Sequence, residues 1–238
     1  TPQEHEFMEK LSATYDGSDV PGGVGAHSDP AFAEQVKTLQ TSHFNDFFDA
    51  HSYVYGPALR LFNDSIMKHF DQEWYTRFYG TPPAEQFRIV IGFVNGPSCY
   101  GPSRQLVGQS KEVFSIIGYA ANRKGQPVLM ADLGTVVHEF NHSFIKIEGD
   151  TKNALAKSGK TIKSYSAFCM KQQAYDSWQT ILEESLVRAA EKCYFIEHWD
   201  GKVDKGIRNE MNHGFFWMPE LVQTLRYYES HRKKYPTF

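Results

Sequence analysis

The chain has 238 residues, of which 41% are hydrophobic and 22% are charged, a composition typical of a soluble globular domain. No run of apolar residues is long enough to cross a membrane, and the net charge of −3 gives no basic surface for nucleic acid. We therefore expect neither a transmembrane protein nor a nucleic-acid partner.

The N-terminal part of the chain is predicted to be an arm followed by helices. Residues 1–30 are rich in Gly, Asp and Ser, which is typical of a loop or a loosely attached arm. The segments 30–49 and 57–79 are aromatic and helical in pattern. The apolar stripe of the second segment consists of Leu59, Phe62, Ile66 and Phe70.

Three segments in the middle of the chain are predicted to be strands. Residues 87–95 and 111–120 are rich in β-branched and aromatic residues, and a Gly/Pro/Ser-rich loop, 96–110, separates them. Residues 128–130 add a short third strand. A small sheet between helical parts predicts an α+β fold.

Residues 131–145 are predicted to form an amphipathic helix that carries His-Glu-Phe-Asn-His at positions 138–142. His138 and His142 lie one turn apart on the same face of such a helix, so both imidazoles reach one metal ion. Glu139 lies beside them, where a general base acts on a metal-bound water. Random placement gives about 0.03 matches to this H-E-x-x-H pattern per chain, which favours a metal site over two histidines on a solvated face. The apolar stripe consists of Leu133, Val136, Val137, Phe140 and Phe144, and Asp132 suits the helix N-terminus.

A catalytic zinc usually has three protein ligands and one open position, so a third ligand must come from another segment. An extended motif would place a glycine three residues and a histidine or aspartate six residues after His142. These positions hold Ile145 and Glu148, so that motif is absent. A histidine third ligand, His198 or His213, is one alternative.

The other alternative is a glutamate on a second long helix, predicted over residues 175–197. Glu184 lies opposite its apolar stripe and Glu183 near the edge, and a ligand helix should turn its polar face to the site, which favours Glu184. The polar stretch 146–170 is expected to link the two helices, and 216–234 to form a C-terminal helix. The stripe of the second helix consists of Trp178, Leu182, Leu186, Ala189, Cys193 and Ile196.

Together the two segments resemble the gluzincins, zinc metallopeptidases that combine H-E-x-x-H with a downstream glutamate ligand. Residues 135–142, Thr-Val-Val-His-Glu-Phe-Asn-His, are very similar to the gluzincin metal helix. Residues 182–187, Leu-Glu-Glu-Ser-Leu-Val, look like the second motif, Leu-Asn-Glu-small-apolar. The resemblance covers about residues 131–197 and implies a bacterial enzyme in which one Zn²⁺ ion is held by His138, His142 and Glu184.

The resemblance also implies a zincin-like fold, in which a small mixed sheet packs on the H-E-x-x-H helix and the remainder is largely helical. In that layout an exposed edge strand binds the peptide substrate through main-chain hydrogen bonds, and we expect 111–120 to be this edge. The expected domain spans 1–238, with a helical part at 1–85, strands within 86–130, and the metal ligands in a helical part at 131–238.

The chain departs from the gluzincin pattern in two places. Many gluzincins carry an acidic residue four positions after the glutamate ligand, where it orients a ligand histidine, whereas this chain has Arg188. Arg188 is expected to pair with Glu184 or Glu191, or to bind a substrate carboxylate. The Gly-x-Met-Glu-Asn motif of the aminopeptidase branch is missing, so nothing indicates an exopeptidase.

The implied reaction is hydrolysis of a peptide or protein substrate. Zinc lowers the pKa of its water from about 16 to about 7, and Glu139 takes the proton and passes it to the leaving amine. A Tyr or His should stabilise the oxyanion, and the candidates are Tyr165, Tyr194 and His213. The alternatives are a zincin-like domain that binds without catalysis and a zinc hydrolase of a non-peptide amide. Glu139 favours an enzyme, because a binding domain has no chemical need for it.

Three cysteines, Cys99, Cys169 and Cys193, allow at most one disulfide and lack zinc-finger spacing. Cys193 fits a helix stripe, which predicts a buried thiol. The sequence begins at Thr1 rather than Met, which is consistent with removal of a leader. Since zinc peptidases are often exported, we expect a secreted or periplasmic protein.

Overall fold

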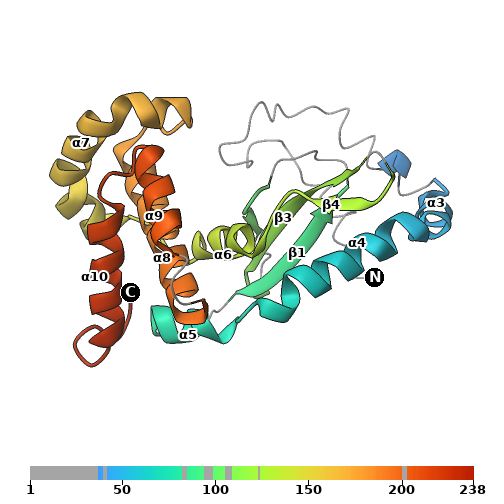
Figure 1. Cartoon of the computed structure of the whole chain (residues 1–238), viewed down its shortest axis with the longest axis horizontal. Coiled ribbons are helices and arrows are strands. Elements are labelled where there is room, and N and C mark those ends of the chain that lie inside the picture. The colour runs from blue at the N-terminus through green and yellow to red at the C-terminus, as the bar shows by residue number, and fades with distance from the viewer. Residues whose placement is uncertain are drawn as a thin grey trace. The chain divides into compact units, whose positions relative to one another are not determined.

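The computed structural model (Figure 1) divides the chain into two compact units, Thr1–Pro57 and Ala58–Phe238. The described part of the first unit is helical and contains α3 (Phe44–Ala50) and the first turns of α4 (Ser52–Ser65). The second unit holds the sheet, the other helices and every candidate site residue. The predicted arm lies outside the described residues, which are 37–39, 42–81, 85–93, 99–104, 109–122, 124–199 and 203–238.

The helix predicted over 57–79 is divided into three pieces, α4, a single 3-10 turn η1 (Met67–His69), and α5 (Glu73–Tyr79). The backbone leaves helical geometry at Ile66, so the predicted stripe does not continue beyond this residue. Ile66 is buried, whereas Leu59 of the same predicted stripe is 51% exposed. Gly80 ends α5 in the left-handed conformation (φ 81°), which glycine adopts without steric cost.

The sheet is built around β3 (Glu112–Ala121), which pairs in parallel with β1 (Gln86–Gly92). On its other side β3 pairs antiparallel with β2 (Ser103–Arg104) and β4 (Pro127–Leu129). The prediction that 111–120 forms the exposed edge is therefore wrong, because both sides of β3 are paired. β2 and the isolated bridge between Tyr100 and Ile116 lie within the predicted loop 96–110. They were not predicted, because Pro and Gly are typical of turns.

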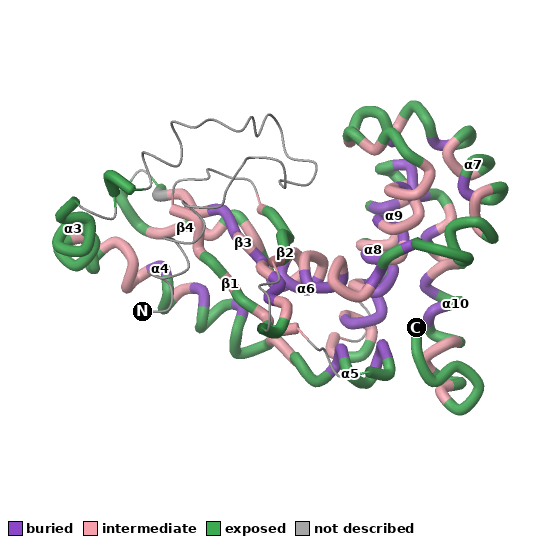
Figure 2. The backbone as a smooth tube through the Cα atoms, turned by 180° about the vertical axis from the view of Figure 1, so that it is seen from behind, coloured by how far each residue is buried: buried purple, intermediate pink, exposed green. Residues whose placement is uncertain are grey.

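An aromatic layer joins the sheet to α6 (Leu133–Asn141), the helix that carries the two histidines. Phe87 of β1 stacks on Phe140 of α6 with ring centroids 4.3 Å apart. Tyr79 of α5 stacks on Phe144 at 4.3 Å, which closes the layer beyond the end of α6. Figure 2 shows the resulting buried stretch along α6 and β3. As predicted, Asp132 caps α6, since its side chain accepts a hydrogen bond from the backbone N–H of Thr135.

Four further helices form the C-terminal part: α7 (Gly149–Gln172), α8 (Trp178–His198), α9 (Val203–Asn212) and α10 (Met218–Ser230). The predictions for α8 and α10 are confirmed, whereas α7 was expected to be a polar link and α9 was not predicted. Most of α7 is exposed and polar, so it shows little apolar periodicity. α8 packs against α6, α7, α9 and α10. Residues outside its predicted apolar stripe, such as Glu184 and Lys192, are therefore buried as well.

The described residues form a mixed α+β structure with a small mixed sheet and a largely helical remainder, as the sequence predicted. None of the described helices is long and apolar enough to span a membrane. The cysteines are free thiols, and Cys193 is buried as predicted, which raises its pKa to about 12.

Candidate metal centre

α6 and α8 bring the three predicted metal ligands together. The Nε2 atoms of His138 and His142 are 3.3 Å apart. The carboxylate of Glu184 on α8 reaches both rings, with Oε1 3.4 Å from Nε2 of His142 and Oε2 3.7 Å from Nε2 of His138. Donors about 2.0–2.2 Å from a tetrahedral zinc lie about 3.3–3.5 Å from one another. These three side chains, called the metal cluster below, therefore fit one zinc ion.

Burial and neighbouring charges act differently on the two histidines. Burial lowers the pKa of His142 to about 4, against the opposing charge of Glu184, so this ring is neutral at pH 7 and offers a lone pair. Burial also lowers the pKa of His138, but its interactions with Glu191 and Glu184 outweigh burial and the pKa is raised. A bound cation would replace the proton that His138 attracts.

Glu139 lies beside the metal cluster in an environment that suits a general base. Burial raises the pKa of its carboxyl group, and the charge of Glu184 adds to this while His138 and Arg188 oppose it. A raised pKa makes a carboxylate a stronger base at neutral pH. Gly101 passes directly over this group, because a Cβ at that position would overlap Oε2 of Glu139.

The carboxylate next to His138 is Glu191, which was not predicted to lie at this position. Its Oε2 is 3.7 Å from Nδ1 of His138, the ring nitrogen that faces away from the ligand position. Burial raises the pKa of Glu191, but His138 and Lys192 outweigh it and the pKa is lowered, so the group is ionised. Glu191 lies two turns after Glu184 on the same face of α8, and this i, i+7 spacing was the available signal.

Arg188 occupies the position where an acidic residue was expected, and it binds the metal cluster from outside. Its Nε lies 3.5 Å from Oε2 of Glu184, and it donates hydrogen bonds to Glu210 at 2.9 Å and to the hydroxyl of Tyr175 at 3.2 Å. The first alternative named for Arg188, pairing with Glu184, is thus the geometry observed.

Tyr175 is the phenol that the fold brings to the metal cluster. Its hydroxyl donates to Oε2 of Glu184 at 3.1 Å. Burial and the charge of Glu184 raise its pKa, so the phenol keeps its proton at neutral pH. With 13 Tyr in the chain, no pattern distinguished this one, which lies in the turn before α8.

The three phenol and imidazole groups predicted to stabilise an oxyanion lie elsewhere. Tyr165 projects from α7 and is 81% exposed, and His213 is exposed after the last turn of α9. Tyr194 is buried, and its hydroxyl donates to the carbonyl of His69 and accepts from the backbone N–H of Asp71. In the described structure none of them makes a hydrogen bond or ion pair with the metal cluster, because their helix positions direct them to other faces.

Glu183, the other candidate glutamate, has a structural contact. It accepts hydrogen bonds from the backbone N–H of Ile147 at 2.9 Å and from Gln179 at 3.1 Å. These bonds tie the segment after α6 to α8 and leave Glu184 as the ligand candidate.

A second group of ligand-type residues contains His198, the alternative third ligand, with Asp71 and Glu197. Arg77 joins its two carboxylates, with NH2 2.7 Å from each, and His198 lies 3.1 Å from Asp71. In these four residues, called the Arg77 cluster below, one guanidinium group already pairs with both carboxylates. His198 is thus engaged away from the metal cluster.

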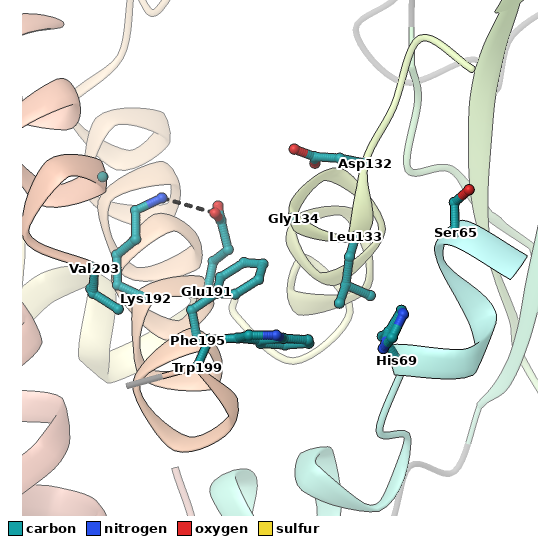
Figure 3. Close-up of a pocket in the computed structure, with 11 residues that line it drawn as sticks. Ser65, His69, Asp132, Leu133, Gly134, Glu191, Lys192, Phe195, Trp199 and Val203 are labelled. Carbon is teal, nitrogen blue, oxygen red and sulfur yellow. Dashed lines mark hydrogen bonds and ion pairs between the residues drawn. The ribbon is translucent and has the colours of Figure 1, made fainter. Parts of the chain in front are cut away.

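Two adjoining cavities lie beside the metal cluster, between α6 and α8. The smaller, of about 340 Å³, is bordered by His138, Arg188 and Glu191. The larger, of about 450 Å³, extends past Glu191 to an apolar wall (Figure 3). Figure 3 shows Phe195 and Trp199 reaching from α8 toward Leu133 and His69. The smaller cavity thus gives a polar space next to His138, and the larger one adds an apolar space beyond Glu191.

A family model described as a domain of unknown function (DUF4932) matches residues 26–238. No curated protein and no solved structure matches the chain. The match covers the sheet, the metal cluster and the Arg77 cluster, and its description assigns no chemistry to them. Function must therefore be inferred from the geometry of the site.

Proposed function

The chain belongs to the DUF4932 family, and we propose that it is a zinc-dependent metallopeptidase of the gluzincin type with a zincin-like fold. The observation that carries the proposal is the convergence of His138, His142 and Glu184 with Glu139 beside them. Two imidazoles and a carboxylate, with a free glutamate next to them, are the donor set and base that zinc hydrolases use.

The charges around the metal cluster also fit a divalent cation. Four carboxylates and two cationic side chains lie in or next to it, which leaves a formal net charge of −2 when both histidines are neutral. An uncompensated charge in a largely buried site is costly, and Zn²⁺ would balance it. The carboxylates are Glu139, Glu184, Glu191 and Glu210, and the cations are Arg188 and Lys192.

The side chains around the cluster divide the chemistry of peptide hydrolysis between them. When bound, zinc would lower the pKa of a water molecule and polarise the scissile carbonyl. Glu139 would accept the proton of that water and deliver it to the leaving amine. The hydroxyl proton of Tyr175, which is donated to Glu184 in this structure, would turn to the carbonyl oxygen as negative charge develops there. Glu191 would hold the imidazole of His138 in one orientation.

The extended segment from the bridge residue Tyr100 to β2 favours a peptide over other amides as the substrate. Tyr100 exchanges two hydrogen bonds with Ile116, and the carbonyl of Pro102 accepts from Phe114. Because hydrogen-bonding groups alternate along a strand, the N–H and C=O of Gly101 point away from β3. An extended peptide pairing with Gly101 would run along the carboxylate of Glu139, which lies directly beneath.

Replacing the proposed base tests the function directly. Wild type should contain about one zinc per chain and cleave members of a peptide library. Glu139→Gln should keep the zinc and lose about 10²- to 10⁴-fold in rate, while Glu148→Gln, an exposed control, should behave as wild type. Wild type without zinc would refute the metal centre. Zinc without cleavage would favour a zincin-like domain that only binds.

A further inference from the structure

Six ionisable side chains on three helices close a ring on one side of the metal cluster. From Glu184 the contacts run to Arg188 at 3.5 Å, to Glu210 at 2.9 Å and to Lys192 at 3.1 Å. They continue to Glu191 at 2.8 Å, to His138 at 3.7 Å and back to Glu184 at 3.7 Å. Acidic and basic groups alternate around the whole ring. We call these six residues the charge ring.

Glu210 on α9 is the point where the two arms of the ring meet. One arm reaches Glu184 through Arg188, and the other reaches His138 through Lys192 and Glu191. Glu210 itself touches neither metal ligand, and its side chain is buried, with the residue 5% exposed. Glu210 thus holds both Arg188, which contacts Glu184, and Lys192, which reaches His138 through Glu191.

We propose that Glu210 is a positioning residue for the metal centre, and that α9 belongs to this centre although it supplies no ligand. This inference rests on the proposed function, because it requires the cluster to bind zinc. Without Glu210, Arg188 and Lys192 would have only Glu184 and Glu191 as carboxylate partners among the ring residues. Each cation would then bind its remaining carboxylate more strongly, in competition with the metal and with His138.

Glu112 of β3 is a matched control for the loss of a buried, doubly paired carboxylate. It is 6% exposed and accepts hydrogen bonds from Arg88 and Arg104. Phe87 faces α6, and side chains alternate along a strand, so Arg88 and its partner Glu112 lie on the opposite face of the sheet. Replacing Glu112 also removes a buried carboxylate with two cationic partners, but at a position away from the proposed metal ligands.

The test measures zinc affinity of the full chain by competition with a chromophoric chelator, together with thermal unfolding. Glu210→Gln is expected to weaken Zn²⁺ binding about 10-fold or more, since outer partners of metal ligands contribute at this level. Glu112→Gln is expected to leave the affinity at the wild-type value, although both variants lower the Tm. Equal affinities in the two variants would overturn the inference. Wild type that binds no zinc would instead refute the proposed function, and this inference with it.

A second variant separates the arms and keeps the test valid if Glu210→Gln does not fold. Lys192→Met leaves the pair between Arg188 and Glu210 in place and frees Glu191 from its cation. We expect weaker Zn²⁺ binding and a shifted visible spectrum when Co²⁺ replaces zinc, because the orientation of His138 changes. A wild-type Co²⁺ spectrum with wild-type Zn²⁺ affinity would show that the ring does not position the ligands.

Discussion

The metal cluster and the Arg77 cluster contain the same kinds of side chain but differ in where the cation lies. In the Arg77 cluster the guanidinium lies 2.7 Å from both Asp71 and Glu197, so each carboxylate has a cationic partner within the group. Next to the metal cluster, Arg188 makes its shorter contact with Glu210, at 2.9 Å against 3.5 Å to Glu184. Ligand-type residues alone therefore do not distinguish the two clusters, and the position of the nearest cation is our reason for proposing the metal at His138, His142 and Glu184.

A tyrosine accompanies each cluster, and its hydrogen bonds differ in the same way. Tyr194 is saturated by the backbone, since its hydroxyl accepts from Asp71 and donates to the carbonyl of His69. Tyr175 instead donates to a proposed ligand, Glu184, and accepts from Arg188. One phenol completes a fold contact, and the other is directed at the site.

The largest expected effect comes from removing one glutamate from each cluster. Glu184→Ala should weaken zinc binding by more than about 100-fold, because even the outer partners of metal ligands contribute 10- to 100-fold. Glu197→Ala should leave the zinc content unchanged and destabilise the fold, since it leaves part of Arg77 unpaired. Metal analysis of both proteins after dialysis decides between them. Loss of zinc in Glu197→Ala alone would reverse the assignment of the two clusters.

Glu183→Ala sharpens the same comparison within α8. Its carboxylate holds the backbone N–H of Ile147, so we expect lower stability and wild-type zinc affinity. Zinc loss in this variant, with Glu184→Ala unaffected, would exchange the roles of the two neighbouring glutamates.

Exchanging phenylalanine for each tyrosine tests whether the phenols differ as their hydrogen bonds suggest. With the zinc site saturated, Tyr175→Phe should lower kcat about 100-fold, equivalent to about 3 kcal/mol of transition-state stabilisation. Loss of the hydrogen bond to Glu184 should also weaken zinc binding about 10-fold. Tyr194→Phe should lower the free energy of unfolding by about 1–3 kcal/mol and leave kcat unchanged. Peptide kinetics and urea unfolding measure the two effects. If Tyr165→Phe lowered kcat and Tyr175→Phe did not, the original prediction for Tyr165 would be restored.

The sequence predicted those parts of the site that depend on local periodicity. The spacing of His138 and His142 and the apolar stripe of α6 follow from one helix, and Asp132 marks where it begins. The choice of Glu184 over Glu183 was also made from helix geometry, although Glu184 is buried between helices rather than exposed on a polar face.

Residues that meet only through the tertiary fold were not predictable in this way. Glu210 reaches the charge ring because α9 packs against α8, and no sequence spacing encodes that contact. β2 and the bridge at Tyr100 depend on their pairing with β3, and Pro102 between them is typical of a turn instead. Arg77 is a similar case. It pairs with Glu197, which lies 120 residues further along the chain, so the sequence does not show that the carboxylates near Asp71 have a cationic partner.

A smaller effect on zinc affinity is expected when one neighbouring carboxylate, Glu191, is neutralised and compared with Glu197 of the Arg77 cluster. Glu191→Gln removes the charge beside Nδ1 of His138 and should weaken zinc binding about 10- to 100-fold. Glu197→Gln should leave the zinc affinity unchanged, since Arg77 still binds Asp71. Chelator competition compares the two variants. Equal zinc affinities would mean that Glu191 does not orient the histidine.

The smallest effect separates the clusters by pH. Burial raises the pKa of Asp71, but its hydrogen bonds with Arg77 and His198 outweigh burial, so the pKa is lowered in the folded state. A carboxyl group of this kind stabilises the fold above its unfolded pKa of about 3.9, and the contribution is lost as pH falls through the lowered pKa. Asp71→Asn should therefore reduce the free energy of unfolding by about 1 kcal/mol at pH 7, and the difference from wild type should shrink below about pH 4.

Urea unfolding at pH 7, 5 and 3 measures this difference. Asp64→Asn serves as the control, because the pair between Asp64 and Lys68 is exposed and contributes little. A difference that stayed constant down to pH 3 would mean that Asp71 stabilises the Arg77 cluster through packing rather than charge. The contrast between a cluster that contains its own cation and one proposed to bind a metal would then lose its electrostatic basis.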